Sequence, residues 1–306
     1  PMQPLAHDRP LFGISVTPTA ADHPRLIQQV RAAERGGLDL VGIQDHPYQR
    51  RFLDTFSLIA DVAARTERIR FFPDVANLPL RGPTMIAKAA ASMDVMSGGR
   101  FELGIGAGTF WDSVAGMGGP RRTAGESITA LEEALRIIRA VLDGERVVRG
   151  DGEFYPVPGY PPGPPPAHRV ELWLGVYRRR GLDLIGRLGD GWVPSLGYLP
   201  PGRFRAAASR LDEAAARASR DPREIRRIYN LTGRITDGEV GDGPLVGPVE
   251  LWTERLIEWY LDLGVDTFIF WPADAETRDI ERFAQDVVPA VLDATARVRP
   301  AGLPLP

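Results

Sequence analysis

The chain contains 306 residues, of which 43% are hydrophobic and 25% are charged, and it contains no cysteine. This composition is typical of a globular protein of one large or two modest domains, and it excludes disulfides and cysteine-ligated zinc or iron–sulfur sites. A formal net charge of −3, from 37 basic and 40 acidic residues, argues against a nucleic-acid-binding surface.

Apolar, strand-like runs alternate with amphipathic, helix-like stretches along almost the whole chain. The pattern predicts the first four strands at 11–16, 38–44, 69–76 and 100–106. It predicts the helices that follow them at about 22–35, 55–65, 83–96 and 127–142. Asp22 and Pro24 mark the start of the first helix, and Gly36 marks its end.

The alternation pauses at residues 144–169. This segment contains a short hairpin-like stretch and the run PVPGYPPGPPP, in which seven of eleven positions are proline. Proline at this density favours extended backbone with few hydrogen-bond donors. Because the alternation resumes beyond it, we interpret the segment as a surface insertion and not as a linker between domains.

The second half of the chain predicts four more strands, at 170–176, 191–194, 226–235 and 267–271. The corresponding helices are expected near 182–188, 202–218, 248–263 and 277–297. Eight strand–helix units predict an α/β fold, a (β/α)8 TIM barrel, as a single domain over residues 1–299 with the insertion between units four and five. Residues 300–306 are expected to form a flexible tail.

A doubly wound sheet is the main alternative to the barrel. Such a sheet commonly carries a glycine-rich phosphate loop after its first strand, and this chain has TPTAADHP there. No apolar run reaches the roughly 18 residues that span a bilayer, and the first ten residues lack the apolar core of a signal peptide. We therefore expect a cytoplasmic protein without a membrane partner.

In a TIM barrel the functional residues lie in the loops after the strands. After the second strand, His46 is a candidate general acid or base, and Asp45 either orients it or caps the turn. The alternative is that both side chains only satisfy backbone donors before Pro47. The four histidines lack metal-ligand spacing, so we expect no metal site.

The third and fourth strands end in unusual sequences. Pro73 lies within the third strand and indicates either a bulge or the strand's end. Glycines after the fourth strand, among them Gly106 and Gly108, allow either the close approach of a flat ligand or only a tight turn.

The fifth strand leads into its helix through GVYRRRG, which starts at Gly175. Backbone N–H groups at a helix N-terminus, reinforced by Arg178, Arg179 and Arg180, form an anion site. The alternative is that the three arginines are solvated surface charge. Aromatic residues near the strand ends, including Tyr177, are suited to wall a pocket for a planar cofactor.

Several stretches resemble the luciferase-like flavin-dependent oxidoreductases, a family that includes bacterial luciferase, flavin monooxygenases and coenzyme F420-dependent reductases. They are LDLVGIQDH, IRFFPDVANLPLRGPTMIAKAAASMDVMSGGRFELGIGAG, ELWLGVYRRRGLDLIGRLGDGWVPS and GVDTFIFWP. Together they cover nearly the full chain, and SGGRFELGIGAG is the most specific part.

The resemblance implies a barrel that holds a flavin or deazaflavin across its C-terminal mouth, with a non-prolyl cis peptide near Asp74-Val75. It implies that His46 contacts the cofactor and that Gly175–Arg180 binds the phosphate. The cofactor-binding residues that we infer are Asp45, Asp74, Val75, Asn77, Gly106, Gly108, Asp112, Gly175, Tyr177, Arg178, Arg179 and Arg180. Thr109 stands where some F420-using sugar-phosphate dehydrogenases have a catalytic glutamate, which argues against that activity.

The resemblance is stronger to the F420-dependent branch, and the arginine cluster suits the longer acidic tail of F420. We therefore predict an oxidoreductase that transfers a hydride between F420 and a small organic substrate, with His46 handling the accompanying proton or polarising the substrate's oxygen. The alternatives are an FMN-dependent monooxygenase, which uses O2 and reduced flavin from a separate flavin or F420 reductase, and a non-catalytic flavin-binding protein. The family also implies a homodimer.

Overall fold

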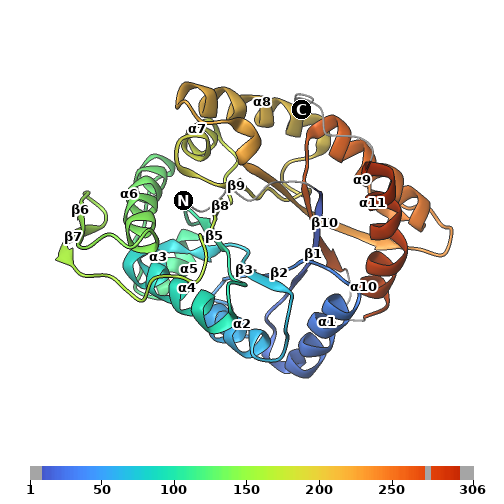
Figure 1. Ribbon diagram of the computed structural model, residues 1–306, viewed down its shortest axis with the longest axis horizontal. Helices are drawn as coiled ribbons and strands as arrows, with labels where there is room; N and C mark the ends of the chain where they lie inside the picture. The colour runs from blue at the N-terminus through green and yellow to red at the C-terminus, as the bar shows by residue number, and fades with distance from the viewer. Residues whose placement is uncertain (1–8, 273–276, 297–306) are drawn as a thin grey trace.

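The computed structural model describes residues 9–272 and 277–296. In this part of the chain, parallel strands form a sheet that is nearly closed into a barrel, and helices surround it (Figure 1). The sheet runs in the order β3-β2-β1-β12-β10-β9-β8-β5-β4. A bridge between Phe71 and Phe101 joins its two ends, with the Phe71 N–H donating to the Arg100 carbonyl at 2.8 Å. The predicted barrel is therefore confirmed.

The first four units follow the predicted alternation. Their elements are β1 (Leu11–Val16), α1 (His23–Arg35), β2 (Leu40–Ile43), α2 (Thr55–Ala63), β3 (Arg70–Pro73), β4 (Ala76–Asn77), α3 (Leu78–Arg81), α4 (Pro83–Ser97), β5 (Leu103–Gly106), α5 (Trp111–Gly116) and α6 (Ala124–Leu142). The helix predicted from residue 127 begins at Ala124, because Thr123 and Glu126 form a capping box. The third strand is interrupted after Pro73 and resumes as β4.

The second four units are completed by β8 (Leu172–Leu174), α7 (Arg179–Leu188), β9 (Gly191–Trp192), α8 (Pro201–Arg217), β10 (Arg226–Ile235), β11 (Val246–Gly247), α9 (Val249–Leu263), β12 (Thr267–Pro272), α10 (Arg278–Arg282) and α11 (Val288–Thr295). Short 3-10 turns lie at Ala20–Asp22 and Pro222–Glu224, and Phe283–Val287 is π-helical. The predicted tail at 300–306 lies outside the described residues.

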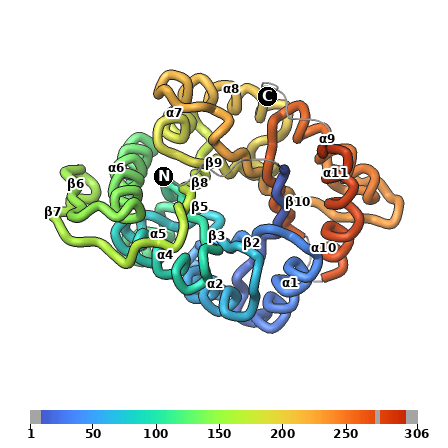
Figure 2. Tube along the Cα trace, viewed as in Figure 1, coloured from blue at the N-terminus to red at the C-terminus, as the bar shows by residue number. Residues whose placement is uncertain are grey.

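A two-stranded hairpin lies between α6 and β8 and stands outside the ring of helices (Figure 2). Its antiparallel strands are β6 (Val148–Asp151) and β7 (Pro156–Tyr160), so the predicted hairpin-like stretch is confirmed. The Glu133 carboxylate on α6 accepts hydrogen bonds from the N–H groups of Glu153, Phe154 and Tyr155, which attach the hairpin to the barrel.

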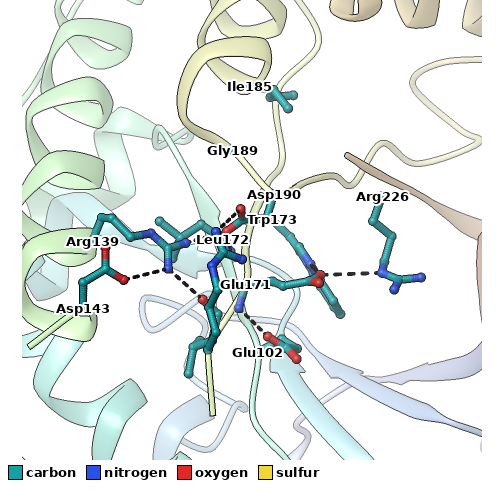
Figure 3. A network of polar contacts seen from close by, with 12 residues as sticks. Glu102, Arg139, Asp143, Glu171, Leu172, Trp173, Ile185, Gly189, Asp190 and Arg226 are labelled. Atoms are coloured by element: carbon teal, nitrogen blue, oxygen red, sulfur yellow. Dashed lines mark hydrogen bonds and ion pairs between the residues drawn. The ribbon is translucent and has the colours of Figure 1, made fainter. Parts of the chain in front are cut away.

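A network of charged side chains closes the end of the barrel where the strands begin (Figure 3). The Glu171 carboxylate accepts from Trp173 Nε1 at 2.7 Å and lies 3.6 Å from Arg226 Nε. The Asp190 carboxylate pairs with Arg139 at 2.5 Å and with Arg169 at 2.7 Å. Residues at this end of a TIM barrel generally serve stability. The opposite end, where the strands finish, is therefore where functional residues are expected.

Candidate active site

The chain bends sharply where β3 gives way to β4. The Asp74–Val75 peptide bond is cis, at the place that the sequence resemblance implied. The Asp74 N–H donates to the Ile43 carbonyl at 2.7 Å, so the bend stays attached to the end of β2. Pro73 thus marks an interruption of the strand and not its end.

Val75 extends from this bend across the ends of β5 and β8. A Cβ atom at Gly106 would lie 2.8 Å from Val75 Cγ2, and one at Gly175 would lie 3.1 Å from the same atom. A side chain at Gly106 would displace Val75, and one at Gly175 would press tightly against it. Gly106 and Gly175 therefore leave room for Val75, and the cofactor contact expected of both glycines stays a prediction.

Asp45 anchors the neighbouring segment. Its buried carboxylate accepts from the Asn77 N–H at 2.8 Å and from Nε and Nη2 of Arg81, each at 2.7 Å. The same guanidinium reaches Asp54 at 2.6 Å. Because both carboxylate oxygens accept hydrogen bonds, Asp45 holds β4 and α3 against the end of β2, and its expected cofactor contact stays a prediction.

His46 lies in an aromatic setting at the rim. Its Nδ1 is 2.8 Å from the Tyr48 hydroxyl, and the ring of Phe110 meets the imidazole edge to face, with centroids 5.9 Å apart. Burial lowers the His46 pKa, although the charge of Asp45 opposes this effect. Burial also raises the pKa of Tyr48 to about 12, so this phenol stays protonated. The imidazole is therefore neutral at neutral pH, and the Tyr48 contact at Nδ1 orients its ring.

Asp74 is the centre of a cluster of polar side chains. The sequence pointed to Asp74 and Tyr177 but not to the other three members, which are Ser15, Asn230 and Ser195. Its Oδ1 accepts from Asn230 Nδ2 at 3.0 Å and its Oδ2 accepts from Ser15 Oγ at 3.4 Å. Asn230 Nδ2 also donates to Ser195 Oγ at 3.4 Å, and the Ser195 N–H donates to the Tyr177 hydroxyl at 3.2 Å. Burial raises the pKa of Asp74 to about 6, against the opposing hydrogen bonds from Asn230 and Ser15. A polar residue within an otherwise apolar run, as in LFGISV and IYNL, was the available signal.

Two buried amide oxygens, one on β4 and one on β10, have no partner among the described residues. They are Oδ1 of Asn77 and Oδ1 of Asn230, and both residues are buried. Buried polar groups are normally hydrogen-bonded, so an orphaned acceptor indicates a ligand or water. Flavin and deazaflavin rings carry a ring N–H donor between two carbonyl groups, and acceptors of this kind therefore fit them.

The arginine run divides into two parts. Arg180 turns toward α6, where it donates to the Gly125 carbonyl at 3.3 Å and to Thr129 Oγ1 at 3.2 Å. The side chains of Arg178 and Arg179 are exposed, and their guanidinium groups form no ion pair or hydrogen bond with another described residue. They stand at the first turn of α7, where no side chain caps the helix. This pairing of free guanidinium groups with free N–H groups suits an anion.

Asp112 and Gly108 have local roles. Asp112, in the first turn of α5, is exposed and forms an ion pair with Arg121. Gly108 has a φ of +101°, and a Cβ atom there would lie 2.7 Å from the Trp111 ring. The conformation and packing of the loop therefore require this glycine. The structure shows neither residue turned toward Asp74 or the start of α7, and their predicted cofactor contact stays a prediction.

The remaining surface features lie elsewhere. A cavity of about 250 Å³ lies near the other end of the barrel, between the end of α6 and the residues before β8, and its lining includes Arg139 and His168. Within residues 9–272 and 277–296, no three acidic or histidine side chains are arranged to hold a metal ion. None of the helices in these ranges combines the length and the apolar character needed to cross a bilayer.

Comparison with known proteins gives consistent matches. The family model described as luciferase-like monooxygenase matches residues 11–239. A Mycobacterium tuberculosis protein, described as uncharacterized, is 30% identical over 245 residues, which are 78% of this chain and 79% of that protein. The F420-dependent glucose-6-phosphate dehydrogenase of Gordonia bronchialis is 29% identical over 227 residues, or 72% of this chain and 67% of the relative.

The fold has close counterparts among solved structures. The coenzyme F420-dependent tetrahydromethanopterin reductase of Methanopyrus kandleri superposes with a TM-score of 0.79 at 19% identity. The match covers 92% of this chain and 99% of the reductase. At this identity the likeness concerns the fold alone.

Proposed function

This chain belongs to the luciferase-like monooxygenase family, and from that premise we propose that it is an oxidoreductase transferring a hydride between coenzyme F420 and a small organic substrate. The observation that carries the choice of cofactor is the pair Arg178 and Arg179, which have no acidic partner among the described residues and stand at an uncapped helix start. F420 carries more negative charge in its tail than FMN does. The relative from Gordonia bronchialis that is named as F420-dependent supports the same choice.

The residues at the mouth fit this cofactor. Arg178, Arg179 and the N–H groups of α7 would hold the acidic tail, and Val75 would support the ring beside the cis bend. The orphaned amide oxygens of Asn77 and Asn230 would accept hydrogen bonds from the ring. When bound, reduced F420 supplies the hydride. The contribution of the protein is then orientation of the reacting groups, which accounts for a large part of the rate in such enzymes.

His46 would polarise the reacting group of the substrate. Its imidazole is neutral, and its Nε2 forms no hydrogen bond with another described residue. Tyr48 and Phe110 hold the ring in place. A ring held in this way is suited to form a hydrogen bond to a substrate atom whose charge changes in the reaction.

The second candidate is an FMN-dependent monooxygenase, which the description of the family favours. The same arginine pair suits the single phosphate of FMN, so the two candidates differ in the charge that the site must balance. A monooxygenase would also need a reductase to supply reduced flavin. A protein that binds the cofactor but turns over no substrate would be a flavin carrier.

Titration of the apo-protein with F420 and with FMN, followed by fluorescence, tests the proposal. We expect F420 to bind more tightly, and R178A/R179A to weaken F420 by at least tenfold, because each charge-assisted contact contributes about 1.5–3 kcal/mol. R180A is the matched control, since Arg180 already contacts α6. Tight FMN binding without F420 affinity would refute the choice of cofactor, and oxygen uptake coupled to substrate would establish the monooxygenase.

A further inference from the structure

The cavity of about 250 Å³ lies at the end of the barrel where the strands begin. The last turn of α6 lines one side of it, and the segment that joins the hairpin insertion to β8 lines the other. An apolar cavity of about 150 Å³ can hold a benzene molecule. The larger cavity here therefore has room for a small organic molecule that carries a polar group.

Much of the cavity wall is apolar. Leu142 of α6 and Val170 are buried, and residues 165 and 166 are prolines, which have no N–H group to donate. His168 also lines the cavity, but both of its ring nitrogens lie against buried carboxylates, at 2.7 and 3.0 Å. The imidazole therefore contributes ring surface to the wall and has no nitrogen left for a ligand.

The arginines beside the cavity outnumber the carboxylates that they face. Asp190 is 2.5 Å from Arg139, 2.7 Å from Arg169 and 3.9 Å from Arg220. Arg139 also lies 3.6 Å from Asp143, which is exposed (Figure 3). Among the described residues, these three guanidinium groups thus form ion pairs with only two carboxylates. One positive charge is left in excess at this side of the barrel.

The effect of this excess is visible at Arg220. Burial lowers its pKa, the charges of Asp190 and Glu224 oppose this effect, and the neighbouring guanidinium groups of Arg169 and Arg139 lower it further. Arg220 itself is committed to the fold, because its Nη1 donates to three carbonyl groups at the end of α7. The uncompensated charge is therefore available only at Arg139 or Arg169.

Arg169 is the guanidinium that remains available to a ligand. It lines the cavity, its side chain is 46% exposed, and its Nη2 donates to Asp190. Its Nε and Nη1 have no partner among the described residues. Arg139 differs, because its Nη1 donates to the Val170 carbonyl at 3.1 Å and its Nη2 donates to Asp190. A guanidinium with unused N–H groups is suited to bind a carboxylate.

We propose that this cavity is a second binding site and that it takes a small organic carboxylate with an apolar body. The carboxylate accepts hydrogen bonds from Arg169 and balances the excess positive charge, and the apolar body lies against Leu142, Val170 and the prolines at 165 and 166. Inorganic phosphate would leave the apolar wall uncovered, and a neutral molecule would leave the charge unbalanced. None of these residues belongs to the mouth of the barrel, so the site is independent of the function proposed above.

Calorimetric titration of the full chain with three probes tests the chemistry of the site. Benzoate combines a carboxylate with an apolar ring, benzamide has the same shape without the charge, and inorganic phosphate has charge without the ring. We expect benzoate to bind saturably at millimolar concentration and the other two to bind at least about tenfold more weakly. The proposal is wrong if benzoate does not saturate, or if benzamide or phosphate binds as tightly as benzoate.

Substitutions test the position of the site. R169Q should weaken benzoate binding at least about tenfold, and Asp190 keeps two arginine partners in this variant. R136A is the matched control, since Arg136 lies on α6, pairs with Glu132 and does not line the cavity. R178A/R179A should also leave benzoate binding unchanged. If R178A/R179A abolishes binding and R169Q does not, benzoate binds at the mouth and the proposal is refuted.

An NMR measurement on the wild type does not depend on any variant folding correctly. In 1H–15N spectra, benzoate should shift the backbone amide resonances of residues 142–144 and 167–170, which border the cavity. The amides at the start of α7 serve as the internal control and should keep their positions. Shifts that leave residues 142–144 and 167–170 unaffected would overturn the assignment.

Discussion

Replacing Asp74 with asparagine is expected to make the folded protein more stable at neutral pH. The substitution keeps the shape of the side chain and an oxygen that can accept from Asn230, but it removes the carboxyl group that must ionise in a buried setting. The folded-state pKa of about 6 lies well above the ordinary value of 3.8. Between these two values the folded state binds more protons than the unfolded state, so the free energy of unfolding decreases as pH rises through this window.

The size of the effect follows from the two pKa values. The difference between 3.8 and about 6 corresponds to about 3 kcal/mol at pH 7, since each pKa unit is worth about 1.4 kcal/mol. At pH 4.5 the folded state is still protonated at Asp74 and only about 1 kcal/mol of this cost is present. D74N should therefore gain about 2 kcal/mol relative to the wild type between pH 4.5 and pH 7.

Urea denaturation at the two pH values, with and without the substitution, measures this gain directly. Comparing the difference at pH 7 with the difference at pH 4.5 cancels any pH-independent change in packing. D221N provides the matched control. Hydrogen bonds from Arg223 lower the pKa of Asp221, so removing the Asp221 carboxylate should produce no gain in the free energy of unfolding when the pH is raised. If D74N shows the same stability difference at both pH values, Asp74 is not held protonated and the reasoning fails.

Three further substitutions test the site. D45A should lower the free energy of unfolding by about 3–5 kcal/mol in urea, because it leaves a half-buried Arg81 without its bidentate partner; a loss below 1 kcal/mol would contradict the anchoring role. G106A should cost about 1–3 kcal/mol by forcing Val75 aside, and the double variant with V75A should recover most of it. Y48F should change urea stability by about 1 kcal/mol and reduce turnover; unchanged turnover would argue against its role in orienting the imidazole.

The fold could be predicted because its signal is repeated along the chain. Each unit alternates an apolar run with an amphipathic stretch, and the eight repeats support one another even where a boundary is displaced by a few residues. The structure adds elements that this pattern does not contain. The short helix α5 lies between the strand predicted at 100–106 and the helix predicted at 127–142, and the third strand is divided by the bend at Asp74.

The site could be predicted only as far as the ends of the strands. The position of a residue along a strand does not determine which partner its side chain meets. Asp45 illustrates this limit, because it follows β2 as expected but pairs with Arg81, 36 residues further along the chain. Ser15 and Asn230 were missed for the opposite reason. Each lies within an apolar run and becomes significant only when the closed barrel brings both against Asp74.

The two ends of the barrel differ in how their charged side chains are paired, and this difference indicates where the functional residues lie. At the end where the strands begin, buried carboxylates face arginines, as Glu171 faces Arg226 (Figure 3). At the other end, no described cation pairs with Asp74, and no described acid pairs with Arg178 or Arg179. Burying the Asp74 carboxyl group without a cation costs stability, and proteins tolerate such a cost at functional sites. Arg178 and Arg179 are exposed, so solvent satisfies them until an anion binds. The unmatched groups therefore mark this end of the barrel as the place where we expect a ligand, with its anionic part at the start of α7.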